Sequence, residues 1–484
     1  MANKKLYIFG IGGTGSRVIK ALTMLLASGV KLSNGFDTVV PIIIDPDIAN
    51  GDLNKTGDIL IKYQNIFNEV GTDNKLFGTK ISTLRQLTDG NVSNLSNNFK
   101  FSVDGSGQKF GESIDYNGLD AENKALIDLL FSAENIEADM TVGFKGNPNI
   151  GSIVLNKIVD STEYKEFTNS FNQGDAIFII SSIFGGTGAS GFPLLLKNLR
   201  KEDSKVTNSN IISKSVIGAI TYLPYFKISP PDEGEKVIDS STFFSKAKAA
   251  LSYYQHAIFD NKTLDAFYHL GDHSNNNMTH APGEEQQKND AHFLEMAGAL
   301  AVVDFVDSIN NLNHTIKEFG IEEEGKKLVF ENLGATTKNK LSLPLSKLSL
   351  LQRFLENSMS YLLNSAGDFN NEAIKKDFYS SDFYKANFSK FLDYFNEWLN
   401  EMGNNDVSFD PFYDDSQDHD KIMEYIKGNP PKKSLFKNNA KGDIIIRELD
   451  NIANKGTYRF EKDPSKFLKI FDDVLENQVN NLLK

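Results

Sequence analysis

Cysteine is absent from this 484-residue sequence. The chain therefore has no disulfide bond, no zinc–thiolate site and no cysteine nucleophile. Long hydrophobic runs are also missing. The apolar run Leu6–Phe9 is too short for the core of a signal peptide, and no stretch reaches the length needed to span a bilayer. We therefore expect a cytoplasmic protein without a membrane partner.

An excess of positive charge is the third feature that the sequence lacks. The sequence contains 51 Lys and Arg residues and 64 Asp and Glu residues, which gives a formal net charge of −13. It contains no long Lys/Arg run. Proteins that bind the phosphate backbone of nucleic acids usually carry a basic excess. We therefore expect no nucleic-acid partner.

The hydrophobic pattern favours an α/β fold. Continuous apolar runs such as Val39–Ile44 and Ala176–Ser182 are typical of strands buried on both faces of a parallel sheet. Segments with helical spacing, such as Ser16–Ala27, alternate with these runs. We predict a Rossmann-like parallel sheet in residues 1–310. Residues 311–484 should form a mostly helical C-terminal region, whose aromatic-rich helices could face a protein partner.

A glycine-rich loop follows the first apolar run. Gly10, Gly12 and Gly15 have the G-x-G-x-x-G spacing of dinucleotide-binding loops, and no Lys-Ser or Lys-Thr closes a Walker loop. Glycine lets the backbone approach a ligand closely, and the N–H groups at a helix start suit a phosphate. The loop also fits a tight turn without a ligand. The predicted binding residues here are Gly10, Gly12, Gly13, Thr14, Gly15 and Ser16.

A second glycine-rich loop, Phe184–Gly191, follows the apolar run Ala176–Ser182 and precedes another helix. Two such junctions in one sheet could hold different phosphates of one nucleotide. Hydroxyl groups in the two loops could add hydrogen bonds or orient Mg²⁺ through water. The predicted binding residues in this loop are Gly185, Gly186, Thr187, Gly188, Ala189 and Ser190.

These loops resemble those of the tubulin/FtsZ superfamily. Phe184–Gly191 is similar to its signature loop, and Gly12–Gly15 is similar to its first phosphate loop. The segment Ile42–Asn54, which contains Asp45, resembles bacterial tubulin-like proteins. The resemblance implies a tubulin/FtsZ-type nucleotide-binding domain that takes GTP or GDP with Mg²⁺ and assembles into homo-oligomers or filaments. The signature differs at Phe184, where a further glycine is usual, and at Ser190, which displaces the last glycine.

The resemblance also bears on GTP hydrolysis. In this superfamily, an acidic loop from the next subunit completes the catalytic site, and that loop follows a long core helix. If His292–Val306 is the core helix, the segment after it lacks the Asn-x-Asp-x-x-Asp pattern of that loop. Asp304 and Asp307 then stand in as the nearest catalytic acids. The family also contacts guanine from this helix, for which Asn289 or Asp290 is the nearest residue.

Three alternatives stay open at this point. The first loop and Asp45 are also similar to ThiF/MoeB-type adenylating enzymes, in which an acidic residue after the second strand binds ribose and ATP activates a carboxylate. The same Asp45 could bind a ribose in a nicotinamide-binding domain. Neither of these explains the second glycine loop. The third alternative is a non-catalytic tubulin-like scaffold that keeps both loops for assembly or regulation.

Overall fold

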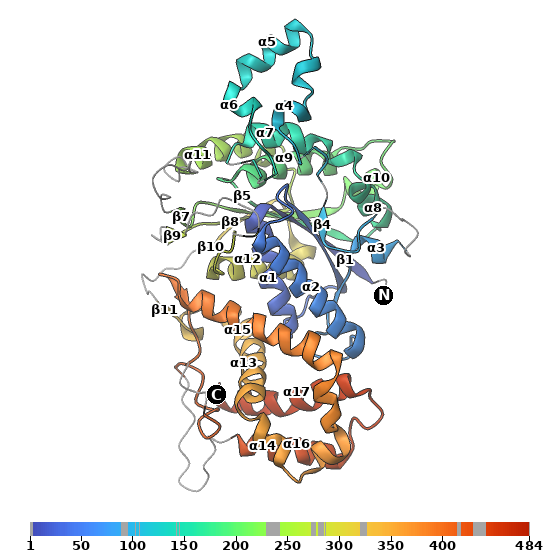
Figure 1. Ribbon diagram of the computed structural model, residues 1–484, viewed down its shortest axis with the longest axis vertical. Coiled ribbons are helices and arrows are strands. Elements are labelled where there is room, and N and C mark those ends of the chain that lie inside the picture. The colour runs from blue at the N-terminus through green and yellow to red at the C-terminus, as the bar shows by residue number, and fades with distance from the viewer. Residues whose placement is uncertain are drawn as a thin grey trace.

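The computed structural model has a parallel sheet at its centre and helices around it (Figure 1). The residues that the structure describes are 3–88, 95–101, 103–105, 107–141, 143–144, 146–228, 243–272, 277–278, 285, 287–319, 327–413, 418–428 and 442–483. The predicted α/β, Rossmann-like fold class is confirmed.

The central sheet has the spatial order β10-β8-β6-β5-β1-β2-β3, with β4 also paired to β2. Every pairing in it is parallel. Along the chain, the strands grow outward from β1 first toward β3 and then, from β5, in the opposite direction. This is the doubly wound arrangement. The strands are β1 Lys4–Ile11, β2 Phe36–Ile44, β3 Lys80–Ile81, β4 Lys100–Phe101, β5 Ala176–Ser182, β6 Val216–Tyr222, β8 Ala266–Leu270 and β10 Thr315–Phe319.

Helices cover both faces of the sheet, which is why its central strands are apolar throughout. Phe9 packs on Phe167 of α8, with ring centroids 5.0 Å apart, whereas Phe178 packs on Phe305 of α12 at 5.2 Å. Ile8 is the residue paired with Phe178, so Phe9 and Phe178 point to opposite faces. The helices nearest the sheet are α1 Gly12–Ser28, α2 Gly51–Val70, α8 Thr162–Ser170, α9 Gly186–Arg200, α11 Phe243–Tyr254 and α12 Phe293–Ser308.

The C-terminal region is mostly helical, as predicted, and lies against one end of the sheet domain (Figure 1). Phe391 of α15 packs on Phe77, which follows α2, with ring centroids 4.9 Å apart. The sheet itself continues through β10 to Phe319, beyond the predicted boundary at residue 310. The elements here are α13 Ala335–Asn357, α14 Met359–Asn364, α15 Lys390–Gly403, α16 Asp443–Lys455, α17 Asp463–Leu482, and the paired β11 Lys327–Leu328 and β12 Ser408–Phe409.

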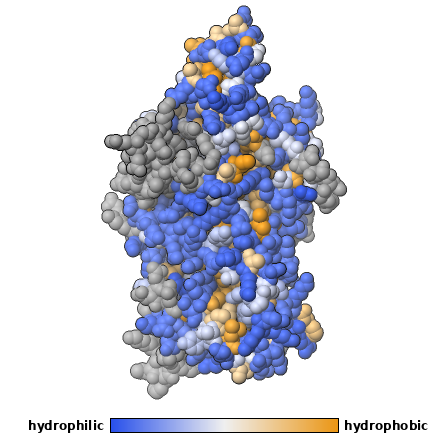
Figure 2. All heavy atoms as spheres, viewed as in Figure 1, coloured by the Kyte–Doolittle hydropathy of each residue, from blue (hydrophilic) through white to orange (hydrophobic). Residues whose placement is uncertain are grey.

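A small helical lobe projects from the other end of the molecule (Figure 1). It exposes apolar side chains at its tip (Figure 2), including Leu126, Leu129 and Leu130 of α5. No helix in the described part of the chain combines the length and the hydropathy that crossing a membrane requires. The remaining short elements are α3 Leu84–Leu87, α4 Phe110–Ser113, α5 Ala121–Leu130, α6 Ala133–Ile136, α7 Pro148–Val154, α10 Ser209–Ile212, and the paired β7 Lys227–Ile228 and β9 Asn277–Met278.

Candidate functional site

The two predicted glycine loops lie side by side. They follow β1 and β5, which are neighbours in the sheet, with Gly10 paired to Ile180. A Cβ atom built on Gly12 would lie 3.5 Å from the Cβ of Thr187 and 3.6 Å from the nitrogen of Gly188. The direction of winding reverses between β1 and β5, and ligands of open α/β sheets bind at such switch points, beyond the carboxyl ends of the strands.

The first loop is tighter than the sequence predicts. β1 extends to Ile11, and α1 begins at Gly12, which has a φ of +74° that favours glycine. A Cβ atom on Gly15 would come within 2.5 Å of the carbonyl carbon of Gly10. Close packing of α1 on β1 is therefore enough to explain why residues 10 and 15 are glycines, without a bound ligand. Gly13 is half-buried and lies on the accessible side of the loop, while Thr14 and Ser16 are buried.

The second loop, which joins β5 to α9, is packed as closely as the first. A Cβ atom on Gly188 would meet the carbonyl oxygen of Ser182 at 2.7 Å. The hydroxyl of Ser190 donates to the carbonyl oxygen of Gly186 at 2.7 Å, so this hydroxyl is engaged within the helix. Gly185 and Ala189 are half-buried. Thr187 is 9% exposed and carries the other predicted hydroxyl of this loop.

Neither helix is capped by the side chain of its own N-cap residue. These residues are Ile11 for α1 and Gly185 for α9, and neither helix has an acidic residue in its first turn. The first four N–H groups of a helix have no partner within the helix, and they carry a partial positive charge. Two such helix starts next to each other form a surface that suits an anion.

A third segment, made of residues 143–144 and 146–147, is missing from the sequence-based prediction. A Cβ atom on Gly186 would lie 3.1 Å from the nitrogen of Gly146 and 3.3 Å from that of Asn147. Gly146 has a φ of +73°. Asn147 caps α7, and Pro148 is its first residue, which is a recognisable helix start in the sequence. This segment covers part of the N-terminus of α9.

A buried network of charges lies beside the first loop. Arg17 of α1 is 3% exposed; its Nε contacts Glu295 Oε1 at 2.5 Å and its Nη1 lies 3.4 Å from Asp52 Oδ2. Arg17 Nη2 donates to the hydroxyl of Tyr225 at 2.9 Å. The predicted guanine contact, Asn289, donates its side-chain amide to Asp52 Oδ2 at 2.8 Å. The network therefore joins α1, α2 and α12 around the predicted site.

Asp45 lies just beyond the carboxyl end of β2, close to this network. Burial raises the pKa of its carboxyl group to about 7. The neighbouring Asp47 carboxylate also raises that pKa, while a hydrogen bond from the Asp47 N–H and the charge of Arg17 lower it. Asp45 is 8% exposed. Its charge can therefore change near neutral pH, in contrast to an ordinary aspartate.

We expect Asp45→Asn to change how stability depends on pH. Between pH ~4 and ~7, the folded protein keeps a proton on Asp45 that the unfolded chain has lost, so the contribution of Asp45 falls as the pH rises. Asp45→Asn should therefore raise the free energy of unfolding by about 2–3 kcal/mol more at pH 8 than at pH 5. Thermal unfolding at both pH values measures this. The exposed Asp73→Asn is the control, and equal gains for Asp45→Asn at both pH values would contradict the assignment.

The predicted catalytic acids lie at the opposite edge of the sheet from the glycine loops. Asp304 accepts a hydrogen bond from the hydroxyl of Tyr268 at 2.8 Å and pairs with Lys317. Asp307 accepts from Ser33, which precedes β2, at 2.6 Å and pairs with Lys340. The N-terminal end of α12 contacts Tyr222, the last residue of β6. α12 thus runs from the loop edge to the far edge of the sheet.

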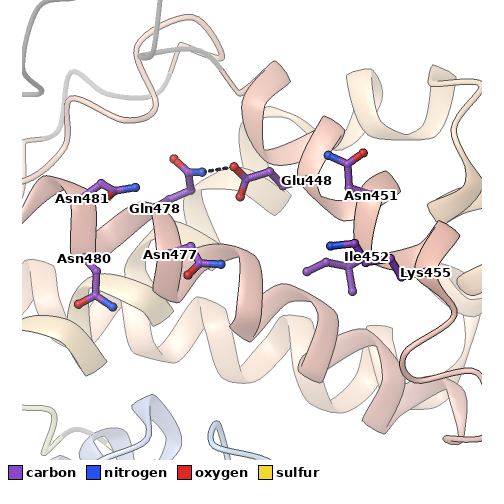
Figure 3. A pocket seen from close by; sticks show the side chains of 8 residues that line it. All are labelled: Glu448, Asn451, Ile452, Lys455, Asn477, Gln478, Asn480 and Asn481. Atoms are coloured by element: carbon purple, nitrogen blue, oxygen red, sulfur yellow. Dashed lines mark hydrogen bonds between the residues drawn. The ribbon is translucent and has the colours of Figure 1, made fainter.

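A separate hollow of about 710 Å³ lies between α16 and α17 in the C-terminal region (Figure 3). Carboxamide side chains dominate its lining, and Gln478 donates to Glu448 across it at 2.7 Å. Lys455 is the one cationic residue among those that line it. The lining contains no glycine-rich helix start, so the hollow offers no cradle of backbone amides for a polyphosphate.

Comparisons with known proteins find a structural likeness. No family model and no curated protein matches the sequence. Among solved structures, CetZ from Methanosaeta thermophila strain DSM 6194 shares 14% identity, covers 63% of this chain and 52% of its own, and has a TM-score of 0.26. CetZ2 from Haloferax volcanii, a GTPγS-bound protofilament, shares 14% identity over 64% of both chains, with a TM-score of 0.31.

TubZ from Bacillus thuringiensis serovar israelensis, a GTPγS-form protofilament, shares 15% identity over 81% of both chains, with a TM-score of 0.26. This chain spans about half to two thirds of the length of the CetZ structures. These CetZ and TubZ structures are thus ones to which this chain is similar at 14–15% identity.

Proposed function

We propose that this chain binds a nucleoside di- or triphosphate, GTP or GDP, at the N-termini of α1 and α9. The observation that carries the proposal is the adjacency of these two helix starts at the switch point of the sheet. A polyphosphate has several anionic groups in a row. Two neighbouring amide cradles can hold different phosphates of the same molecule, which one helix start alone would not achieve.

In this arrangement, the phosphates contact backbone N–H groups of the first turns. The half-buried Gly13, Gly185 and Ala189 mark the side from which the ligand enters. In the described part of the chain, no group of three or more His, Asp or Glu side chains is arranged to hold a metal ion. Mg²⁺ would therefore depend mainly on phosphate oxygens and water, as it does in many nucleotide sites, with the hydroxyl of Thr14 or Thr187 within the same loops.

The choice of guanine rests on the resemblance of the two loops to the tubulin/FtsZ superfamily. Asn289 and Asp45 are the residues that we propose for the nucleoside end of the ligand. Asn289 already binds Asp52 through its side chain and its backbone N–H. A base would have to share or replace this hydrogen bond. Asp45 stands at the end of β2, where an acidic residue can accept hydrogen bonds from a ribose.

Hydrolysis would require a second copy of the chain. Asp304 and Asp307 lie at the far edge of the sheet, so they do not reach the glycine loops of their own chain. They could act only on a nucleotide held by a neighbouring copy in a head-to-tail arrangement. Such contacts are heterologous and extend into filaments unless the rotation between copies closes a ring. Assembly and hydrolysis are therefore coupled in this proposal.

Identification of the bound nucleotide tests the proposal directly. The purified protein should release GTP or GDP on denaturation, as measured by ion-exchange chromatography, and light scattering should rise when GTP and Mg²⁺ are added. Release of ATP or of an adenylate would instead favour the adenylating alternative. Nucleotide binding without any rise in scattering would leave a monomeric binding protein. If the purified protein holds no nucleotide and also does not bind added GTP, the proposal is wrong.

A further inference from the structure

The projecting lobe, residues 107–141, combines exposed leucines with a strong negative charge (Figure 2). Leu126, Leu129 and Leu130 of α5 are more than half exposed and share one face of the helix. The lobe contains eight Asp or Glu residues and two Lys residues, which gives a formal net charge of −6, whereas the whole chain carries −13. Glu122 is exposed on α5, one turn before Leu126. Exposed apolar patches commonly mark contacts with another protein.

The turn between α16 and α17 has the complementary character. It belongs to the region at the opposite end of the molecule from the lobe (Figure 1). Phe460 in this turn is 90% exposed, and Arg459 lies over its ring, 4.6 Å from the ring centroid. From Lys455 to Lys469, the chain has five Lys or Arg residues and two acidic residues, which gives a net charge of +3. Both acidic residues pair with lysines of the same segment.

Leu129, which is 81% exposed, and Phe460 are the two most exposed large apolar side chains in the described part of the chain. Keeping such side chains in water is unfavourable, and burying them in a contact releases that water. Aromatic and Arg side chains are also the types that contribute most to binding free energy in protein interfaces. The two surfaces therefore match in apolar character and are opposite in charge.

We propose that the lobe of one copy docks on the α16–α17 turn of a second copy of this chain. The inference rests on the self-assembly in the proposed function, but it does not require a bound nucleotide. Contact between two lobes, or between two turns, would bring like charges together, which disfavours a symmetric pair. Contact between lobe and turn leaves a pair of copies with one free lobe and one free turn, so it can repeat from copy to copy.

Sedimentation velocity over a range of protein concentrations, with and without GTPγS and Mg²⁺, measures this association. Leu129→Ala and Phe460→Ala should each weaken it about tenfold, because each removes an apolar anchor. Glu122→Lys should weaken it as well, and adding Arg459→Glu to the same chain should restore part of it, because the charges are then exchanged across the contact. The matched control Glu69→Lys reverses an exposed charge on α2 and should leave association unchanged.

A mixture of two defective variants tests the direction of the contact. Leu129→Ala combined with Glu122→Lys keeps an intact turn, whereas Phe460→Ala combined with Arg459→Glu keeps an intact lobe. Each of these variants should stay monomeric alone. The mixture should form a one-to-one complex that does not grow further, because the intact lobe of one variant docks on the intact turn of the other.

The outcomes separate this inference from the proposed function. If Phe460→Ala associates like the wild type, or if the mixture forms no complex, the inference is wrong. A wild type that stays monomeric under all conditions also overturns it. GTP binding, measured separately by isothermal titration, then decides whether the nucleotide site is correct. Circular dichroism should show folded variants throughout, because every substituted side chain is exposed.

Discussion

Gly186→Asp should abolish nucleotide binding, with a loss of at least about a hundredfold in affinity for GTP. The new Cβ atom would lie 3.1 Å from both the nitrogen of Gly146 and the Cβ of Phe144, so the segment over the second loop has to move. The carboxylate would also stand at the start of α9, where it competes with a phosphate for the same N–H groups. Isothermal titration with GTP and Mg²⁺ measures the loss.

The matched control is Gly57→Asp. It makes the same chemical change within α2, where a new Cβ atom meets no other atom within 4 Å. This control should bind GTP like the wild type. Circular dichroism shows whether Gly186→Asp folds. If it does not, Thr187→Ala provides a milder change in the same loop and should still weaken binding. Wild-type affinity in both folded loop variants would remove the second loop from the site.

Arg17→Met should destabilise the sheet domain by about 3–5 kcal/mol. The side chain is 4% exposed, and its loss leaves the carboxylates of Glu295 and Asp52 buried without their cation. An unpaired buried carboxylate destabilises the folded state by more than the ion pair stabilises it. The reason is that no nearby cation then offsets the free energy lost when the carboxylate is removed from water. The midpoint of thermal or denaturant unfolding, followed by circular dichroism, should fall accordingly.

Two comparisons separate this mechanism from a general loss of packing. Lys201→Met breaks an exposed pair with Asp203, in which the lysine side chain is 62% exposed, and should cost no more than about 1 kcal/mol. Arg17→Met combined with Glu295→Leu should recover part of the loss, since one of the two buried carboxylates is removed as well. If Arg17→Met lowers the free energy of unfolding by less than about 1 kcal/mol, the prediction is wrong, and water must reach the carboxylates of the network.

The sequence predicts the elements around the site well where the hydrophobic pattern is continuous. The apolar run Ala176–Ser182 coincides with β5. The core helix expected at His292–Val306 corresponds to α12, with His292 as its N-cap. The start of α1 at Gly12 was harder to predict. Glycine generally destabilises a helix, so a glycine-rich segment does not indicate a helix start. Here Gly10 and Gly15 approach each other so closely that there is no room for a Cβ atom, and glycine is required at both positions.

The contacts between distant segments could not be predicted from periodicity. Arg17, Asp52, Tyr225 and Glu295 come from four separate parts of the chain, and only the folded sheet brings them together. The cover over the second loop is a similar case, although Asn147 and Pro148 signal a helix start locally. Local signals thus predict the loops, while the surroundings that decide their chemistry depend on tertiary structure.

The position of β1 in the sheet has a consequence for how the chain folds. Among the strands of the sheet, β1 comes before both of its partners along the chain, and one of them, β5, follows only after β2, α2, the projecting lobe and α8. Until then, one edge of an apolar strand lacks its hydrogen-bonding partner. Parallel pairings between segments so far apart in sequence form slowly, and unpaired edges promote aggregation. We therefore expect truncations that end before β5 to be insoluble, because they leave this edge of β1 unpaired.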